Sequence, residues 1–207
     1  MLNLQANAIN DIPRKLIIDL DDTCVDTVGA LVKWLHSLNR LSNATNTPLL
    51  LREHLGAWLG VPEELAALWN HEFLSESWQW GATYPILNSQ AVLPSLHKQG
   101  WYIIGYSRAH GALHRAILKR ANLELVFPNV FRDLVVVDKT TKLYPLLKEH
   151  ENAVCVTATE ATARASASAG HATFLIDHPW NRDVDDLTIR RFNNWDEINQ
   201  VLMLMPV

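Results

Sequence analysis

Three acidic side chains follow a short apolar run near the start of the chain. Residues 15–18, Lys-Leu-Ile-Ile, are typical of a strand buried in a parallel sheet. Asp19, Asp21 and Asp22 come at its carboxyl end, followed by Thr23. In open α/β sheets, ligands bind at the edge formed by the carboxyl ends of the strands. Helix capping accounts for one acid well but not for three, so we expect the chemistry of the protein here.

Polar residues also follow three later predicted strands. Ser107 and Arg108 come after the strand at 101–106, and Lys139 and Lys142 come after the strand at 134–137. The strand at 153–156 precedes the residues Thr157, Ala158, Thr159 and Glu160. Because the carboxyl ends of parallel strands share one edge, all these groups should converge on it. Thr23 and Arg108 are the candidate substrate-binding residues.

Strands and helices alternate through the second half of the chain. Strands are predicted at 101–106, 134–137, 153–156 and 172–176, and helices at 91–99, 110–120, 142–150, 160–169 and 195–204. This alternation is typical of right-handed crossovers in an α/β fold with a doubly wound parallel sheet.

A mostly helical segment interrupts this rhythm after the first strand. Apolar residues recur at helical spacing in 28–41, 49–59 and 62–73. We therefore predict a core domain formed by residues 1–26 and 90–207, with a helical cap at 27–89. Four tryptophans crowd together in the later part of this segment: Trp58, Trp69, Trp78 and Trp80. They are candidates for its apolar core or for a stacking wall of a pocket.

Composition narrows the function classes. The 207 residues have a net charge of -4 and no basic run, which argues against binding to a nucleic-acid backbone. The two cysteines form no disulfide framework, and buried thiols are expected. No secretion signal or membrane-spanning stretch is recognised, so a cytoplasmic location without membrane contact is expected. A homodimer is compatible with the sequence.

The ordered motifs resemble those of the haloacid dehalogenase superfamily. Asp19-x-Asp21-x-Thr23 follows strand one, a helical insertion comes next, Ser107 follows strand two, and a lysine precedes strand four. The insertion stands where the first type of cap of that superfamily stands. The closing stretches 170–182 and 194–198 are similar to bacterial and phage members of the 5'(3')-deoxyribonucleotidase branch.

The resemblance implies a Rossmann-like core and a phosphatase chemistry. Asp19 would attack phosphorus and form an aspartyl-phosphate, and Asp21 would protonate the leaving oxygen and then activate water. Two neighbouring carboxylates favour a protonated second acid. Ser107 would bind a phosphoryl oxygen, and Lys142 or Lys139 would neutralise charge.

One motif departs from the family pattern. The family holds Mg²⁺ partly through aspartates after the fourth strand, where this chain has Thr157 and Ala158. The implied metal ligands are then Asp19, the backbone carbonyl of Asp21, and Thr157 through its hydroxyl or a bridging water. Glu160 and Asp177 are alternative acids, although a Glu at a helix start and an Asp in a polar turn explain them better.

Two functions follow from this pattern. The first is a Mg²⁺-dependent phosphomonoester hydrolase, similar to a 5'-nucleotidase, acting on a small phosphorylated substrate such as a nucleotide. The second is a catalytically degenerate relative that binds a phosphorylated ligand or a protein partner without turnover. The complete set of Asp19, Asp21, Ser107 and the lysines favours the enzyme.

Overall fold

A six-stranded parallel sheet forms the centre of the molecule in a computed structural model that describes residues 14–41, 55–75, 77–109 and 112–205. The strands are β1 (Lys15–Asp19), β2 (Tyr102–Arg108), β3 (Asp133–Val137), β4 (Val154–Thr157), β5 (Ala172–Ile176) and β6 (Ile189–Phe192). Their order is β3-β2-β1-β4-β5-β6, and every neighbouring pair is parallel. The predicted α/β, doubly wound fold class is confirmed.

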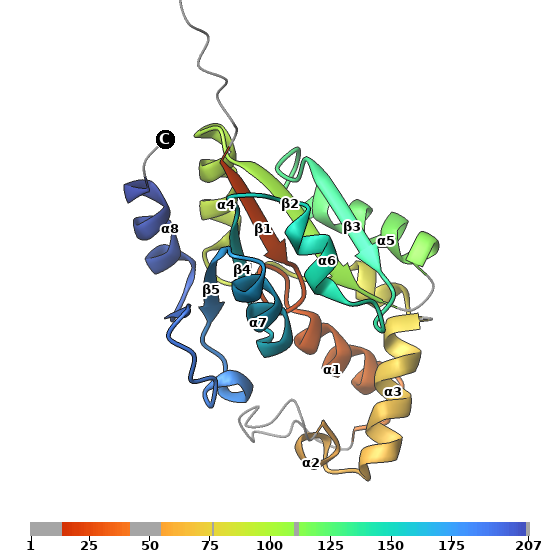
Figure 1. Ribbon diagram of the computed structural model, residues 1–207. Helices are drawn as coiled ribbons and strands as arrows, with labels where there is room; N and C mark the ends of the chain where they lie inside the picture. Colours follow the sequence, from red (N-terminus) through yellow and green to blue (C-terminus); the bar gives the residue numbers. More distant parts are fainter. Residues whose placement is uncertain (1–13, 42–54, 76, 110–111, 206–207) are drawn as a thin grey trace, which may run out of the picture.

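Helices cover both faces of this sheet (Figure 1). One face carries α4 (Ser89–Lys98), α5 (Ala112–Val126) and α8 (Trp195–Leu204), whereas α6 (Leu143–Lys148) and α7 (Glu160–Ser168) lie on the other. Apolar side chains alternate along β1 between these two layers, as the two-residue period of a strand requires. The buried run at 16–18 is therefore explained by helices on both sides.

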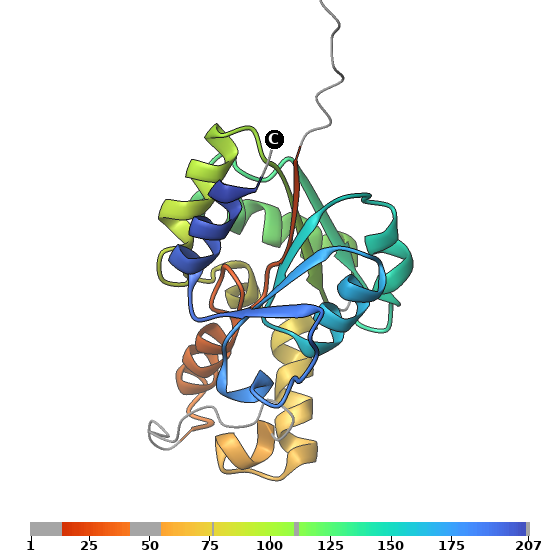
Figure 2. The same ribbon diagram turned by 60° about the vertical axis from the view of Figure 1, so that its left-hand side comes forward.

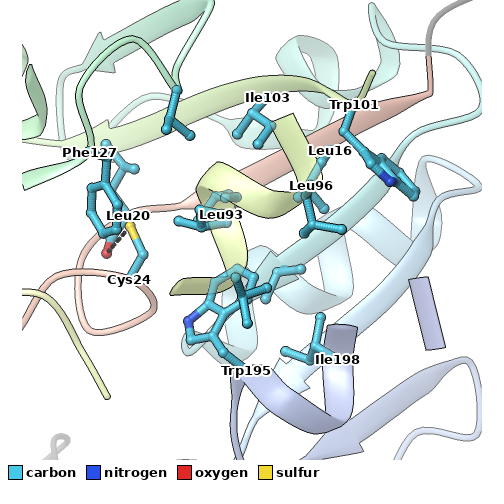
Figure 3. Packing of buried hydrophobic residues seen from close by; sticks show 14 of the residues in the cluster. Leu16, Leu20, Cys24, Leu93, Leu96, Trp101, Ile103, Phe127, Trp195 and Ile198 are labelled. Atoms are coloured by element: carbon cyan, nitrogen blue, oxygen red, sulfur yellow. Dashed lines mark hydrogen bonds between the residues drawn. The ribbon is translucent and has the colours of Figure 1, made fainter. Parts of the chain in front are cut away.

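The larger core lies between the sheet and α4, α5 and α8. Leu16 from β1 packs there with Leu93 and Leu96 of α4 and with Trp195 and Ile198 of α8 (Figure 3). The indole of Trp195 is fully buried, and its Nε1 donates a hydrogen bond to the carbonyl of Thr23 at 2.7 Å. The last helix thereby supports the loop that carries the acids.

The helices that follow β1 gather at the carboxyl end of the strands (Figures 1 and 2). They are α1 (Thr27–Ser37), α2 (Leu55–Leu59), α3 (Glu63–Ser75) and the short 3₁₀ helix η2 (Trp78–Gly81). Leu35, Phe73 and Trp80 are fully buried in an apolar cluster of this unit, separate from the two clusters of the sheet. The exact cap limits, 27–89, stay a prediction.

The observed elements differ from the predicted ones mainly at the ends. The strand β2 continues through Ser107 and Arg108 instead of ending before them, and the sequence pattern did not indicate β6. Two arginines in the four residues of β6 disguise it, and charged residues are common on edge strands. Part of the helix predicted at 49–59 lies outside the described residues. Within those residues, no helix has both the length and the apolarity to cross a membrane.

Candidate active site

Asp19 stands where the order of the sheet reverses direction, between β1 and β4. The register pairs Ile18 of β1 with Val156 of β4, so the next residues, Asp19 and Thr157, lie side by side. The Thr157 hydroxyl donates to Oδ2 of Asp19 at 2.8 Å and accepts from the backbone N–H of Thr159 at 2.9 Å. Asp19 is only 6% exposed, and it lines a cavity. One carboxylate oxygen is thus oriented by Thr157, at the position where ligands bind in such sheets.

Asp21 is held by three donors. Lys119 Nζ lies 3.0 Å from its Oδ1, and the Thr27 hydroxyl donates to the same oxygen at 2.6 Å. The Ser107 hydroxyl donates to Oδ2 in a short hydrogen bond. The third acid, Asp22, supports the cap helix instead, because its Oδ1 accepts the backbone N–H of Val28 at 2.8 Å in the first turn of α1.

These donors set the charge of Asp21. Burial alone would raise the pKa of its carboxyl, but the positive charge of Lys119 and the hydrogen bonds from Ser107, Thr27 and Lys119 outweigh burial. The pKa of Asp21 is therefore below its ordinary value, and the group is a carboxylate near neutral pH. The expectation of a protonated second acid is corrected on this point, because a buried ammonium stands beside it.

Lys119 is a site residue that the sequence patterns did not single out. It is completely buried in α5, with Nζ 4.1 Å from the ring centroid of Trp80 and 3.5 Å from the Trp80 carbonyl oxygen. A signal for it exists in the sequence. Arg115, Lys119 and Asn122 are spaced to share one helix face, and all three are buried, whereas Leu113 and Ile117 are exposed. This inverted pattern marks a helix with a polar inner face.

A cavity of about 600 Å³ opens beside the two acids. Its core side is lined by Asp19, Asp21, Arg108, Lys139, Thr159, Glu160, Ala161, Arg164, Trp180 and Asn181, and its cap side by Thr27, Val28, Leu31, Leu55, Trp58, Asn70, Phe73 and Leu74. The volume is within the usual range for pockets that hold small molecules. One end of the cavity is polar and charged, and the other is mostly apolar.

The predicted cations and Thr23 have different positions. Arg108 lines the cavity, and within the described residues it has no ion-pair partner. Lys139 also lines the cavity, whereas the exposed Lys142 is the N-cap residue of α6 and is not part of the lining. Thr23 is fully buried outside the lining, so the structure does not bring its hydroxyl to the cavity.

The predicted cap tryptophans also differ from one another. Trp69 and Trp80 are buried in the apolar cluster of the cap, and Trp78 is 66% exposed. Trp58 alone of the four lines the cavity. Both cysteines are buried thiols, and burial raises the pKa of Cys155 to about 12, so neither is a nucleophile at neutral pH.

The residues at the end of β4 do not replace the missing acids. The Ala158 carbonyl accepts hydrogen bonds from the side chains of Asn181 and Trp180, at 3.0 Å and 3.3 Å. Glu160 pairs with Arg164 at 2.8 Å. Asp177, the other alternative, is paired with Arg191 at 2.9 Å and is not part of the lining.

This donor set does not fit a magnesium site. Mg²⁺ prefers near-octahedral oxygen coordination with carboxylate ligands. Between the ends of β1 and β4 the acid is Asp19, and the Thr157 hydroxyl donates a hydrogen bond to its carboxylate. Asp19 therefore already has a neutral partner where a metal ion would bind. Among the described residues, no group of three or more His, Cys, Asp or Glu side chains is arranged to hold a metal ion.

Comparison with solved structures gives matches along almost the whole chain. A protein named as HAD-hydrolase YfnB from Bacillus subtilis, solved with magnesium, is 16% identical with a TM-score of 0.57, over 93% of this chain and 99% of that one. A 2-haloacid dehalogenase from Pseudomonas syringae is 16% identical with a TM-score of 0.53, over 93% and 99%. A protein named as a phosphoglycolate phosphatase from Lactobacillus delbrueckii is 11% identical with a TM-score of 0.57, over 92% and 98%.

These similarities define the fold. The chain has the fold of haloacid dehalogenase-like hydrolases, with the helical unit after β1 included in the matched length. A comparison with protein-family models finds no match, and neither does a comparison with curated protein sequences.

Proposed function

We propose that this protein is a hydrolase of phosphomonoesters that uses Asp19 as its nucleophile. The observation that carries the proposal is the convergence of Asp19, Asp21 and the cations Arg108 and Lys139 on one cavity at the reversal point of the sheet. A carboxylate repels a phosphoryl group unless cations neutralise the negative charge, and Arg108 and Lys139 line this cavity together with Asp19. The hydrolase names of the structural neighbours support the same reaction class.

In the first step Asp19 attacks phosphorus, and the bond from phosphorus to the leaving oxygen breaks. The Thr157 hydroxyl holds Oδ2 of Asp19, which leaves Oδ1 as the attacking atom. Because Asp21 is ionised, it has no proton to give to the leaving oxygen. The proton comes instead from the substrate monoanion, which is present near neutral pH because phosphomonoesters have a second pKa near 6.

In the second step water releases the phosphate from Asp19. The Asp21 carboxylate accepts a proton from the attacking water, the new P–O bond forms, and the bond between phosphorus and Asp19 breaks. Asp21 then returns its proton to the departing phosphate. The donors around Asp21 orient its carboxylate, so it suits the role of base in this step better than that of acid in the first.

The cap side of the cavity suits a flat apolar leaving group, as in a nucleotide. Trp58, Phe73 and Leu74 supply apolar wall, and among the cap residues that the structure describes, Asn70 is the one amide that lines the cavity. Within the described part of the chain, the Asn70 amide makes no hydrogen bond, so both its donor and its acceptor are available to a ligand. A nucleobase offers a stacking face together with donors and acceptors at its edge.

Magnesium is the cofactor that the resemblance implies for such a reaction. Of the implied ligands, Asp19 and Asp21 lie on the cavity, and Thr157 is engaged with Asp19. We assign no step to the metal, because the donor set described above does not fit it. The initial experiment therefore measures phosphate release from a panel of nucleoside monophosphates, with Mg²⁺ and with EDTA, for the wild type and Asp19→Asn. Release that vanishes in the variant supports the proposal, and release that persists refutes the nucleophile.

Thr157 and Ala158 favour a second candidate, a protein that binds a phosphorylated ligand without turnover. Their side chains supply no acid where the resemblance implies metal ligands. In this case calorimetry detects binding of nucleoside monophosphates, and no phosphate is released at any Mg²⁺ concentration.

A further inference from the structure

A buried ammonium group stands beside the acids of this site. We propose that Lys119 supplies the positive charge that a divalent cation would otherwise provide, so that the site binds and transforms phosphoryl anions without a metal. The inference rests on the proposed function and deepens it. It concerns a lysine of α5 that lies behind the cavity and acts through Asp21, as a positioning residue.

The first argument is that two oxygens at the reversal point, Oδ2 of Asp19 and the carbonyl of Ala158, already have partners. Thr157 donates to Asp19 at 2.8 Å, and the Ala158 carbonyl accepts from two side chains. A metal ion bound to Asp19 would have to displace the Thr157 hydroxyl or bind the remaining oxygen alone. The hydrogen bond from the Thr157 hydroxyl to the Asp19 carboxylate takes the place that a metal–carboxylate contact would have, and it adds no charge.

The second argument is that moving the Lys119 side chain out of its position would cost free energy. Its side chain is fully buried, its ammonium pairs with Asp21 at 3.0 Å, and the Trp80 ring and carbonyl cover it at 4.1 Å and 3.5 Å. Buried charges interact more strongly than exposed ones, because little water screens them. Lys119 is thus a fixed charge, held in place before any ligand arrives.

The third argument is the balance of charge. Among the described residues, the charged side chains that line the cavity are Asp19, Asp21, Glu160, Arg108, Lys139 and Arg164. Arg164 is engaged by two acids, Glu160 at 2.8 Å and Asp186 at 3.4 Å, so we leave Glu160 and Arg164 out of the balance. Lys119 lies behind the lining and offsets the charge of Asp21 at 3.0 Å, so Arg108 and Lys139 face one carboxylate, Asp19, whose charge no buried ammonium in the described part of the chain offsets. Without Lys119 the two signs are equal.

The test measures the binding of inorganic phosphate by calorimetry and the turnover of p-nitrophenyl phosphate, each in EDTA and in Mg²⁺. The wild type should give equal values in the two buffers within about twofold. Lys119→Met should lose about tenfold or more in phosphate affinity. Lys98→Met, which removes an exposed lysine from the end of α4, should behave as the wild type.

A second pair of variants covers the case in which Lys119→Met does not fold, because it leaves Asp21 without its counter-charge. Asp21→Asn retains Lys119 and removes a negative charge, so it should bind phosphate at least as tightly as the wild type. Asp21→Asn with Lys119→Met removes both charges, and it should bind phosphate more weakly than Asp21→Asn alone. Equal affinity of these two variants would overturn the inference.

The outcomes separate the inference from the proposed function. Turnover or phosphate binding that needs Mg²⁺ overturns the role of Lys119 and leaves Asp19 as the nucleophile. If the wild type hydrolyses no substrate, the proposed function fails, and the phosphate titrations in EDTA still decide whether Lys119 supplies the binding charge.

Discussion

The Nζ atom of Lys119 lies 3.0 Å from Oδ1 of Asp21, across 98 positions of the sequence. The lysine belongs to α5 and the acid to the loop after β1, and their side chains meet beneath Trp80 of the cap. This ion pair joins α5 to the loop after β1, and Trp80 of η2 packs against it. It also decides that Asp21 is ionised before a substrate binds.

Removing the lysine should change how activity depends on pH. In the wild type the pKa of Asp21 is below its ordinary value, so the acidic limb of kcat that belongs to Asp21 lies at lower pH than the titration of an ordinary aspartate. In Lys119→Met the effect of burial is no longer opposed by the ammonium, so the pKa of Asp21 rises and this limb moves to higher pH. Rate profiles from pH 3 to about pH 8 check this, with Lys98→Met as the control. An unmoved limb would mean that Asp21 is not the base.

Arg108 should bind the phosphoryl group of the ligand. Its guanidinium lines the cavity and has no ion-pair partner among the described residues, so its charge is available to an anion. Arg108→Gln should weaken phosphate binding by about tenfold, whereas Arg120→Gln, at an exposed position of α5, should not. Calorimetry with inorganic phosphate measures both. Equal losses in the two variants would point to a general effect of net charge.

Asn70 should select the leaving group. Asn70→Leu keeps the size of the side chain and removes its donor and acceptor, so the KM for nucleoside monophosphates should rise by about tenfold. Turnover of p-nitrophenyl phosphate, which has no nucleobase, should change by less than about twofold. If both substrates suffer equally, the variant has disturbed the cap and Asn70 is no specificity residue.

A carboxylate at position 157 should create metal affinity. In Thr157→Asp, with or without Ala158→Asp, two acids would face each other at the ends of β1 and β4, and Mg²⁺ would relieve their repulsion. Magnesium should then raise the Tm of the variant, since a ligand that binds only the native state stabilises it. Gln200→Glu adds the same charge at an exposed position of α8 and serves as the control. An unchanged Tm would show that the missing acid is not what limits metal binding.

Local patterns were enough to predict the sheet and the edge of the sheet at which several candidate residues lie. The run at 15–18 and the alternation after residue 91 predicted five of the strands, and right-handed crossovers then brought Asp19, Ser107 and Thr157 to one edge. The position of these three residues follows from the strand order, which the alternation of strands and helices in the sequence predicts.

Lys119 could not be predicted in the same way. Its partner is distant in sequence, its helix lies beside the sheet rather than at a strand end, and charged residues in helices are usually exposed. Lys142 shows the opposite case, a lysine at the expected spacing whose side chain is exposed outside the cavity. Spacing alone does not determine which of two lysines faces a site. The local signal for Lys119 is the polar inner face of α5. This signal can be interpreted only once the fold shows which face of the helix is buried.

The central claim is that Asp19 attacks phosphorus, and rapid acid quenching during turnover tests it most directly. Mass spectrometry of the quenched wild type should find one phosphoryl group on the peptide that contains Asp19. Asp19→Asn should show none, and its turnover should fall by about 10³-fold or more, as expected for loss of a nucleophile. Phosphate release by Asp19→Asn at the wild-type rate, or a phosphoryl group on another residue, would contradict the account.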